Sequence, residues 1–350
     1  MKAREYTFDA SYQPQVRTKT GTSNIMLDVI IALIPAMAVG VWQFGARVLA
    51  LLAISVASAV FFEWGYRKLM KKPDSIGDLS ACVTGILLVL TLPSSAPLWM
   101  PVIGAFFAII IVKQLYGGLG KNFVNPALAG RAFLFFSWTK LMTAWAIPNH
   151  LTADAISSAS ITADSVTMAT PLSGMKGDLI ISNAYSYMDM FVGKMPGSIG
   201  EISALALLIG GLYLLAKKVI NWRIPVAYIG TVAVLTLAFG KTGYSNVDWM
   251  MCNLLTGGLF LGAIFMATDY ASSPVTLKGQ LLYGFGCGAL TVLIRYFGGF
   301  PEGVTFAILI MNLCAWAIDK GTRGRQFGVS KEDLKAAKKA AKAAKKEAKA

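Results

Sequence analysis

Charged residues, histidine and clustered cysteine are all scarce in this chain of 350 residues. Only 14% of the residues are charged, against roughly 25% in soluble globular proteins, which excludes that class. The four cysteines form no C-x-x-C pair, and the single histidine, His150, stands alone. Zinc and iron–sulfur sites need clustered ligands, so neither is expected. We interpret the cysteines as buried, reduced packing residues.

Long apolar segments are abundant instead. Hydrophobic residues make up 55% of the chain, and its mean hydropathy is +0.59. A membrane-spanning helix needs roughly 17 to 25 apolar residues, because no lipid-exposed backbone group can remain unbonded. The sequence therefore predicts an all-α polytopic membrane protein with about ten transmembrane helices. The predicted spans are approximately Ile25–Phe44, Val48–Tyr66, Leu79–Leu92, Leu98–Val112, Pro126–Trp145, Ile199–Leu215, Ile224–Phe239, Cys252–Thr268, Leu281–Ile294 and Val304–Ile318.

Lysine and arginine predict which side of the membrane each loop faces, because translocated loops carry few of them. With the N-terminus inside, most basic residues fall on the cytoplasmic side, Lys113, Lys121 and Arg131 among them. Both termini are therefore expected in the cytoplasm, and the mixed polar start predicts no cleavable signal peptide. The expected segments are a cytoplasmic N-terminal segment (1–24), a first transmembrane half (25–145), an extracytoplasmic loop (146–198), a second transmembrane half (199–320) and a cytoplasmic basic tail (321–350).

Two short patterns occur once in each half of the chain. Tyr116–Val124 is similar to Tyr296–Val304, and Val83–Leu87 is similar to Leu255–Leu259. Five spans in each half would give equivalent helices opposite directions. The patterns therefore predict an inverted 5+5 repeat with ligand and ion sites near the middle of the membrane. The alternative is that these glycine-rich steps only allow helices to pack closely.

The extracytoplasmic loop contains the chemically most distinctive stretch, Asp164-Ser165-Val166-Thr167-Met168-Ala169-Thr170. The pattern Asp-x-x-(Ser/Thr)-x-Ala-Thr is similar to the sequence in which flavin transferases join FMN, through its phosphate, to the last threonine. Thr170 is then the expected attachment residue, with Asp164, Thr167 and Ala169 as the modification motif. A transferase on the outer side would reach it on an exposed loop. The alternative interpretation is a solvated loop that ends in a Thr-Pro turn.

The formal charge of +14 depends largely on the alanine- and lysine-rich tail that follows Ser330. Strong helix formers predict a basic helix there, with Ser330 as its N-cap. We expect this helix to lie near anionic lipid headgroups, with docking to a neighbouring protein of a complex as the alternative. No aromatic residues alternate with the lysines, so base stacking has no support and nucleic-acid binding is not predicted.

Ionisable residues near apolar spans are candidates for ion coupling, because placing them there costs free energy. Asp269 follows the eighth predicted span, with the hydroxyl groups of Thr268 and of Ser272 or Ser273 nearby. Such oxygen atoms suit Na⁺ or a proton relay. The alternative is that Asp269 caps backbone groups at the following break. Glu63 is expected to pair with Arg67 one turn later.

Several longer motifs in a fixed order resemble one protein family. They are Met26-Leu27, Lys113–Asn122 with Asn125-Pro126-Ala127, Asp164–Thr170 followed by Pro171-Leu172, Ala267-Thr268-Asp269, and Arg295–Val304. Together, over about residues 20 to 325, they resemble the D subunits of Rnf ion-translocating electron-transport complexes. The B subunit of the Na⁺-translocating NADH:quinone reductase is similar too, but it typically has a longer N-terminus.

This resemblance implies a subunit of an ion-translocating oxidoreductase in a bacterial or archaeal cytoplasmic membrane. The complex would pass electrons between reduced ferredoxin and NAD⁺ and couple this transfer to movement of Na⁺ or H⁺. The subunit would carry covalent FMN on Thr170 and a second, noncovalent flavin, usually riboflavin, near the glycine-rich turn at 117–125. Flavoprotein, iron–sulfur and NAD-binding subunits would be its partners, and a flavin transferase would mature it.

Two other functions fit parts of the sequence. A flavin-free transporter or channel for a small polar solute fits the inverted repeat and predicts a polar pore. A structural scaffold within a redox complex predicts that Thr170 is unmodified and dispensable for electron flow. Neither function needs Asp164 and Ala169-Thr170 in an outer loop, so the motif favours a membrane electron-transfer subunit.

Overall fold

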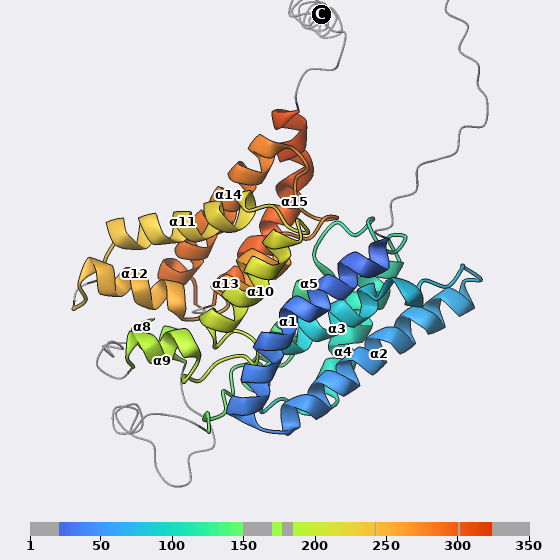
Figure 1. The fold of residues 1–350 in the computed structure, drawn as a ribbon, viewed down its shortest axis with the longest axis horizontal. Coiled ribbons are helices and arrows are strands. Elements are labelled where there is room, and N and C mark those ends of the chain that lie inside the picture. The colour runs from blue at the N-terminus through green and yellow to red at the C-terminus, as the bar shows by residue number, and fades with distance from the viewer. Residues whose placement is uncertain (1–20, 150–169, 177–184, 242, 300–301, 324–350) are drawn as a thin grey trace, which may run out of the picture.

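The computed structural model describes residues 21–149, 170–176, 185–241, 243–299 and 302–323. The first group of helices comprises α1 (Thr22–Phe44), α2 (Arg47–Leu69), the 3₁₀ helix η1 (Ile76–Asp78), α3 (Ser80–Leu90), α4 (Met100–Phe106), the π-helix η2 (Phe107–Gln114), α5 (Pro126–Ser137) and α6 (Thr139–Met142). The second comprises α8 (Pro171–Lys176), α9 (Tyr187–Val192), α10 (Ala204–Ala216), α11 (Arg223–Ala238), α12 (Asn246–Leu255), α13 (Leu259–Leu261), the π-helix η4 (Gly262–Met266), α14 (Leu277–Phe297) and α15 (Val304–Thr322). Figure 1 shows the two groups side by side, with α1 packed along α10.

The helices differ widely in length. Within the described residues, α1, α2, α14 and α15 are long and apolar enough to cross a membrane, and α12 together with α13–η4 forms a further segment bent by 62°. The apolar helices α3, α4–η2, α10 and α11 are only 10–17 residues long. Every predicted span contains helix, which supports an α-helical membrane protein. The number of complete crossings and the inverted repeat stay predictions.

Two predicted spans are not continuous helices. The predicted helix from Cys252 to Thr268 is broken between α12 and α13, where Gly257 has a φ of +77°. Glycine adopts this left-handed conformation without strain. The predicted helix from Pro126 to Trp145 ends at Ser137, because Trp138 is not helical (φ −134°, ψ 56°). Hydropathy does not detect such breaks, since apolar residues continue through them.

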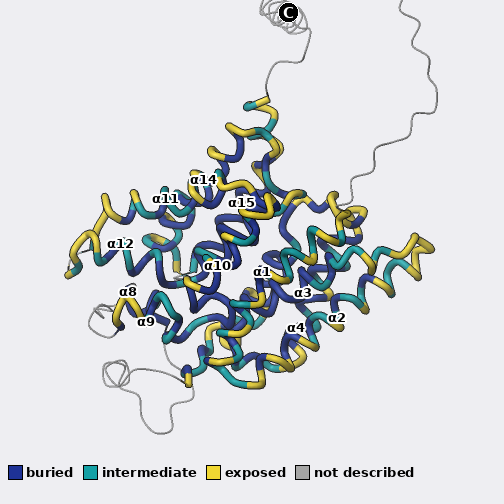
Figure 2. The backbone as a smooth tube through the Cα atoms, viewed as in Figure 1, coloured by how far each residue is buried: buried dark blue, intermediate teal, exposed yellow. Residues whose placement is uncertain are grey.

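α3 lies at the centre of the first group of helices. Every residue of α3 except Cys82 is buried, and Figure 2 shows this region mostly in dark blue. A helix that is apolar and buried on all sides is enclosed by other helices. α2 and α11 instead expose large apolar side chains, such as Phe61 and Val234, as contact with lipid requires. Cys314 is also exposed, so the expectation that all four cysteines are buried is wrong.

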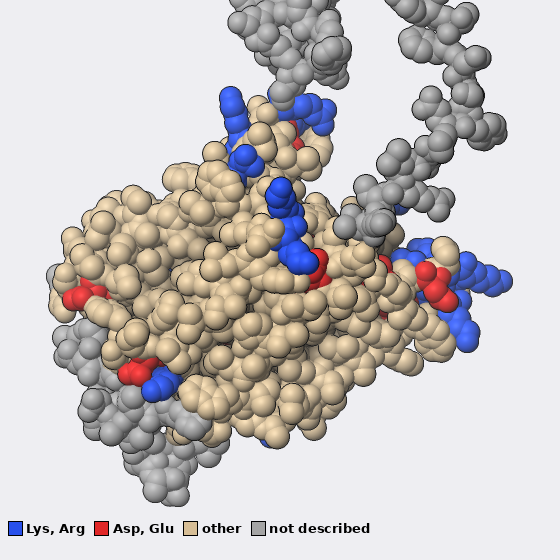
Figure 3. Space-filling model, in the orientation of Figure 1, with Lys and Arg blue, Asp and Glu red and all other residues tan. Residues whose placement is uncertain are grey.

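Many exposed basic residues lie on the side of the molecule where the described chain begins and ends. Figure 3 shows lysine and arginine along the upper and right-hand edges, next to a wide area without charge. Lys71 and Lys72 after α2, Lys217 and Lys218 after α10, and Lys320 near the end of α15 are exposed. α8 and α9, which belong to the predicted outer loop 146–198, lie on the opposite side in Figure 1. The side of the membrane that each end faces stays a prediction.

Gly210 permits the closest approach of the two groups of helices. A Cβ atom at Gly210 of α10 would lie 2.1 Å from the carbonyl oxygen of Ala32 on α1. A Gly210→Ala substitution must therefore push α1 and α10 apart. We expect it to lower the free energy of unfolding by about 1–3 kcal/mol, the typical cost of overpacking.

Thermal unfolding in detergent measures this effect. Gly230→Ala on α11 is the matched control, because a Cβ atom there meets nothing within 4 Å. Alanine also has the higher helix propensity, so this control is expected to be at least as stable as the unchanged chain. Equal unfolding temperatures for the two variants would contradict the close contact.

Candidate functional site

Thr170 is the N-cap residue of α8. Its Oγ1 accepts a hydrogen bond from the backbone amide of Ser173 at 3.2 Å, and its carbonyl oxygen accepts one from the amide of Gly174 at 3.0 Å. A threonine in this position satisfies a helix amide that would otherwise lack a partner. The other residues of the predicted motif, Asp164, Thr167 and Ala169, lie outside the described residues.

The Thr170 side chain is buried. The residue is only 5% exposed, and it borders a narrow space together with Ser198, Glu201, Gly257 and Glu302. The expectation of an exposed loop position is therefore wrong, and so is the alternative of a solvated turn. Both assumed that a polar sequence faces water, whereas this hydroxyl caps a helix whose apolar side chains belong to a buried cluster.

An ionic cluster next to Thr170 joins the two groups of helices. Arg131 of α5 donates hydrogen bonds to Glu201 at 3.2 Å, to Thr305 at 2.7 Å and to Glu302. Ser198 donates to the second carboxylate oxygen of Glu201 at 2.8 Å. Two carboxylates in the interior repel each other and lose the solvation that water provides. Arg131 supplies the positive charge that allows them to lie close together.

The sequence contained a signal for this cluster. The sequence placed Arg131 among the basic residues of the cytoplasmic side, whereas in the structure it lies within α5 and is only 5% exposed. Arg131 and Glu201 both fall inside predicted apolar spans, and an ionisable residue in such a span is a functional candidate by default. Applying that rule to every span, beyond Glu63 and Asp269, would have identified the cluster.

A cavity of about 260 Å³ adjoins α8, and we term it the outer cavity. Leu172 and Met175 of α8 line it together with Trp249 of α12 and with Arg295 and Tyr296 of α14. The indole Nε1 of Trp249 donates to the hydroxyl of Tyr296, and the two rings meet edge-on with centroids 5.9 Å apart. Apolar and aromatic walls with a few fixed polar groups are typical of cofactor sites.

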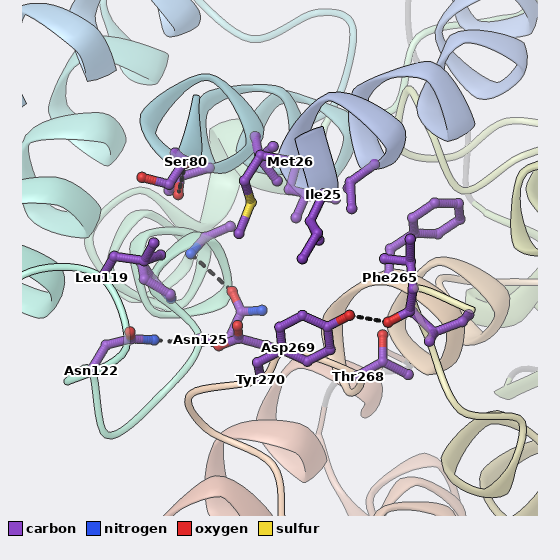
Figure 4. Close-up of a pocket in the computed structure, with 18 of the residues that line it drawn as sticks. Ile25, Met26, Ser80, Leu119, Asn122, Asn125, Phe265, Thr268, Asp269 and Tyr270 are labelled. Carbon is purple, nitrogen blue, oxygen red and sulfur yellow. Dashed lines mark hydrogen bonds between the residues drawn. The ribbon is translucent and has the colours of Figure 1, made fainter. Parts of the chain in front are cut away.

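A second cavity, of about 100 Å³, lies between the two groups of helices, and we term it the inner cavity. Its wall is mostly apolar, with contributions from α1, α3, α5, α10, η4 and the connection that follows α10. Leu119, Asn122 and Asn125 of the glycine-rich turn line it as well. Figure 4 shows Asn122 and Asn125 beside Asp269, to which Asn122 is hydrogen-bonded.

Asp269 borders the inner cavity in the connection that follows η4. Its carboxylate accepts hydrogen bonds from the hydroxyl of Ser272 at 2.9 Å and from the Asn122 amide at 3.3 Å. The predicted proximity to Ser272 is confirmed, whereas Thr268 donates to the carbonyl of Ile264 instead. Burial raises the pKa of Asp269, and these hydrogen bonds oppose the shift. A partly buried carboxylate among oxygen and amide groups is suited to cation or proton binding.

Glu63 has a closer partner than the one predicted. Its carboxylate lies 2.7 Å from the ammonium group of Lys113, but 3.9 Å from Nε of Arg67. Lys113 belongs to η2, lines the inner cavity and also donates to the hydroxyl of Ser80 at 2.6 Å. The sequence favoured Arg67 because it lies one turn later, whereas the fold brings Lys113 to the same carboxylate.

The Arg131 cluster generates a stability prediction. An Arg131→Gln substitution leaves Glu201 and Glu302 buried without their positive partner. Removing one member of a buried ion pair typically costs about 3–5 kcal/mol, so we expect a clear fall in the unfolding temperature in detergent. Lys140→Gln removes the same charge at an exposed position and is the control. If both variants unfolded at the same temperature, the cluster would not be stabilising the fold.

Comparison with known proteins identifies the family. Residues 9–328 match the model described as the NQR2, RnfD, RnfE family. The D subunit of the Na(+)-translocating ferredoxin:NAD(+) oxidoreductase complex of Acetobacterium woodii is 48% identical over 93% of this chain and 97% of the relative. The D subunit of the proton-translocating ferredoxin:NAD(+) oxidoreductase complex of Clostridium ljungdahlii is 44% identical over 92% and 96%. The D subunit of the ion-translocating oxidoreductase complex of Stutzerimonas stutzeri is 38% identical over 89% and 93%.

These matches cover nearly the whole chain and include the segments that form both cavities and the Arg131 cluster. The resemblance to Rnf D subunits that the sequence motifs indicated is therefore confirmed. The chain belongs to the NQR2, RnfD, RnfE family.

Proposed function

We propose that this chain is the D subunit of a membrane complex that transfers electrons between ferredoxin and NAD⁺ and translocates Na⁺ or H⁺, and that it carries FMN as a phosphoester on Thr170. The names of the Acetobacterium and Clostridium relatives support the role in the complex. The position of Thr170 at the start of α8, which lines the outer cavity, is the observation that carries the flavin proposal.

The outer cavity suits the ring of a flavin attached to Thr170. Trp249 and Tyr296 offer aromatic edges, Leu172 offers apolar contact, and Arg295 offers a cationic donor. The ribityl chain between phosphate and ring would have to pass about one turn of α8, roughly 5.4 Å. The bound flavin would supply the redox chemistry, while the protein supplies position and electrostatics.

Burial of the Thr170 hydroxyl has a consequence for maturation. A transferase has to bring the phosphate of FMN to this oxygen, which is buried when α8 is packed in place. Flavin transfer therefore requires α8 to be undocked, before the chain has finished folding or during a local opening. The six residues of α8 form a short element that can open without disturbing the long helices.

The inner cavity is the proposed site of a noncovalent flavin such as riboflavin. At about 100 Å³ the cavity is smaller than a flavin, so the surrounding helices would have to move apart on binding. Asn122, Asn125 and Lys113 place polar groups in a mostly apolar wall, the pattern expected of an oriented cofactor. The Asn125 side chain is held in place, because its oxygen accepts from the amides of Ala127 and Leu128 and its nitrogen donates to the carbonyl of Met266.

Asp269 is the proposed ion-coupling residue. It borders the same cavity as the proposed noncovalent flavin, so a change in flavin charge would act on a cation or proton at this carboxylate over a short distance. The curated relatives include one named for Na⁺ and one named for protons, and the carboxylate with its hydroxyl and amide neighbours is compatible with both.

The proposed partners are flavoprotein, iron–sulfur and NAD-binding subunits, with a flavin transferase for maturation. The proposed location is the bacterial or archaeal cytoplasmic membrane, with both termini in the cytoplasm. The basic tail, almost all of it outside the described residues, is proposed to bind anionic lipid headgroups. A flavin-free transporter or channel for a small polar solute is the alternative function.

Fluorescence of the denatured chain tests the flavin attachment. When the chain is produced with its flavin transferase and run on a denaturing gel, we expect a fluorescent band that Thr170→Ala abolishes, because only a covalent flavin survives denaturation. Thr143→Ala removes a hydroxyl at an exposed position and should leave the fluorescence intact. Absence of fluorescence from the unchanged chain, with an active transferase, would favour the transporter.

Ion uptake by vesicles containing the complex tests Asp269. An Asp269→Asn substitution keeps the size of the side chain but removes the charge that binds a cation. We expect at least a tenfold lower ratio of ions transported to electrons transferred. Asp74→Asn, at an exposed position, is the control. An unchanged ratio in the Asp269 variant would exclude this carboxylate from ion coupling.

A further inference from the structure

Arg295 of α14 is a buried cation that forms no ion pair within 4 Å among the described residues. The carboxylates of Glu201 and Glu302 are near enough to act on its charge from a greater distance. Arg295 is only 5% exposed. Its Nη1 donates to the carbonyl of Asn253 at 2.6 Å and its Nη2 to the carbonyl of Thr256 at 3.3 Å, but Nε has no hydrogen-bond partner. Arg131, by contrast, has two carboxylate partners. A buried donor without an acceptor is costly, so a ligand that places an acceptor or a negative charge next to Nε of Arg295 would be stabilised.

The position of Arg295 connects the outer cavity with the attachment residue. Arg295 lines the outer cavity together with Trp249. A Cβ atom at Gly257 would lie 3.1 Å from Nη2 of Arg295 and 3.1 Å from Cδ2 of Leu172. Gly257 also borders the narrow space that contains Thr170. Arg295 therefore lies next to Gly257 and Leu172, between which a flavin attached to Thr170 would enter the outer cavity.

We propose that Arg295 binds the reduced, negatively charged ring of the flavin attached to Thr170. On reduction by two electrons from a redox partner protein, with one proton from water, a bound flavin ring would carry one net negative charge. The guanidinium group of Arg295 would offset this charge, and its Nε–H, which has no partner, would be available as a donor to the ring. Arg295 would thereby favour reduction of the flavin. This inference rests on the proposed attachment of FMN to Thr170.

The ring fits the surroundings of Arg295 better than the phosphate does. The phosphate would be bonded directly to Thr170, whose neighbours in the narrow space include Glu201 and Glu302. Arg295 instead lines the larger cavity, where Trp249 and Tyr296 can contact a planar ring. A function in holding the phosphate is the competing outcome, and the experiment below distinguishes the two.

The experiment measures the midpoint potential of the covalent flavin in the full chain, with the spectrum of Thr170→Ala subtracted to remove any noncovalent flavin. We expect Arg295→Gln to lower the equilibrium constant for reduction at least tenfold, equivalent to a potential about 30 mV more negative for two electrons. Arg295→Lys keeps the charge but lacks Nε, so a smaller negative shift is expected. The control Lys140→Gln should not shift the potential.

The outcomes separate this inference from the proposed function. If no variant, including the unchanged chain, shows covalent flavin on a denaturing gel, the proposed function itself is wrong. If covalent flavin is present but Arg295→Gln has the same potential as Lys140→Gln, Arg295 does not bind the ring and the proposed function stands. If Arg295→Gln lowers the amount of covalent flavin without shifting its potential, Arg295 acts on the phosphate, which overturns the inference.

A measurement on the unchanged chain covers the case in which Arg295→Gln does not fold. Uptake of one proton per two electrons makes the potential fall by about 30 mV per pH unit. Because Arg295 stabilises the anionic ring, we expect this slope to persist below the pH at which reduced FMN in water takes up a second proton. A slope that doubles at the same pH as for free FMN would overturn the inference.

Discussion

Helix ends inside an apolar molecule need bonding partners from other parts of the chain, and both proposed cofactor sites depend on this requirement. Lipid cannot satisfy a backbone carbonyl group, so a short helix in the membrane region is stable only if protein donors reach its end. For α3, the amide of Gly200 donates to the carbonyl of Leu90 at 2.8 Å. For α12, Arg295 donates to the carbonyls of Asn253 and Thr256. These contacts stabilise the ends of α3 and α12 inside the molecule. The proposed ligand cavities lie beside these helices.

The bent segment from α12 to η4 connects the two cavities. Trp249 and Asn253 of α12 line the outer cavity, while Ile264 and Phe265 of η4 line the inner one. The π-helices η2 and η4 both contribute to the inner cavity, η2 through Lys113. π-helical turns are rare and frequently occur at functional sites. The bent segment from α12 to η4 therefore contacts the proposed sites of both flavins and leads directly to the proposed ion-coupling residue, Asp269.

The two buried arginines show that environment, rather than residue type, decides what a buried charge does. Arg131 forms ion pairs with Glu201 and Glu302, so its charge is used within the fold. Arg295 hydrogen-bonds only to neutral groups among the described residues, and its Nε remains available to a ligand. Two buried arginines close to Thr170 thus have a structural and a ligand-directed role, respectively.

The sequence alone determined the α-helical membrane class, the family and the presence of Asp269 at a helix end, because these depend on composition and on residues close together in the chain. Only the tertiary structure decided that the apolar segment from Cys252 to Thr268 is broken and that Thr170 is buried. It also brought Arg131 to Glu201, 70 residues later. Hydropathy reports the solvent that a segment prefers, whereas breaks, burial and ion pairs depend on which distant backbone and side-chain groups meet in the folded chain.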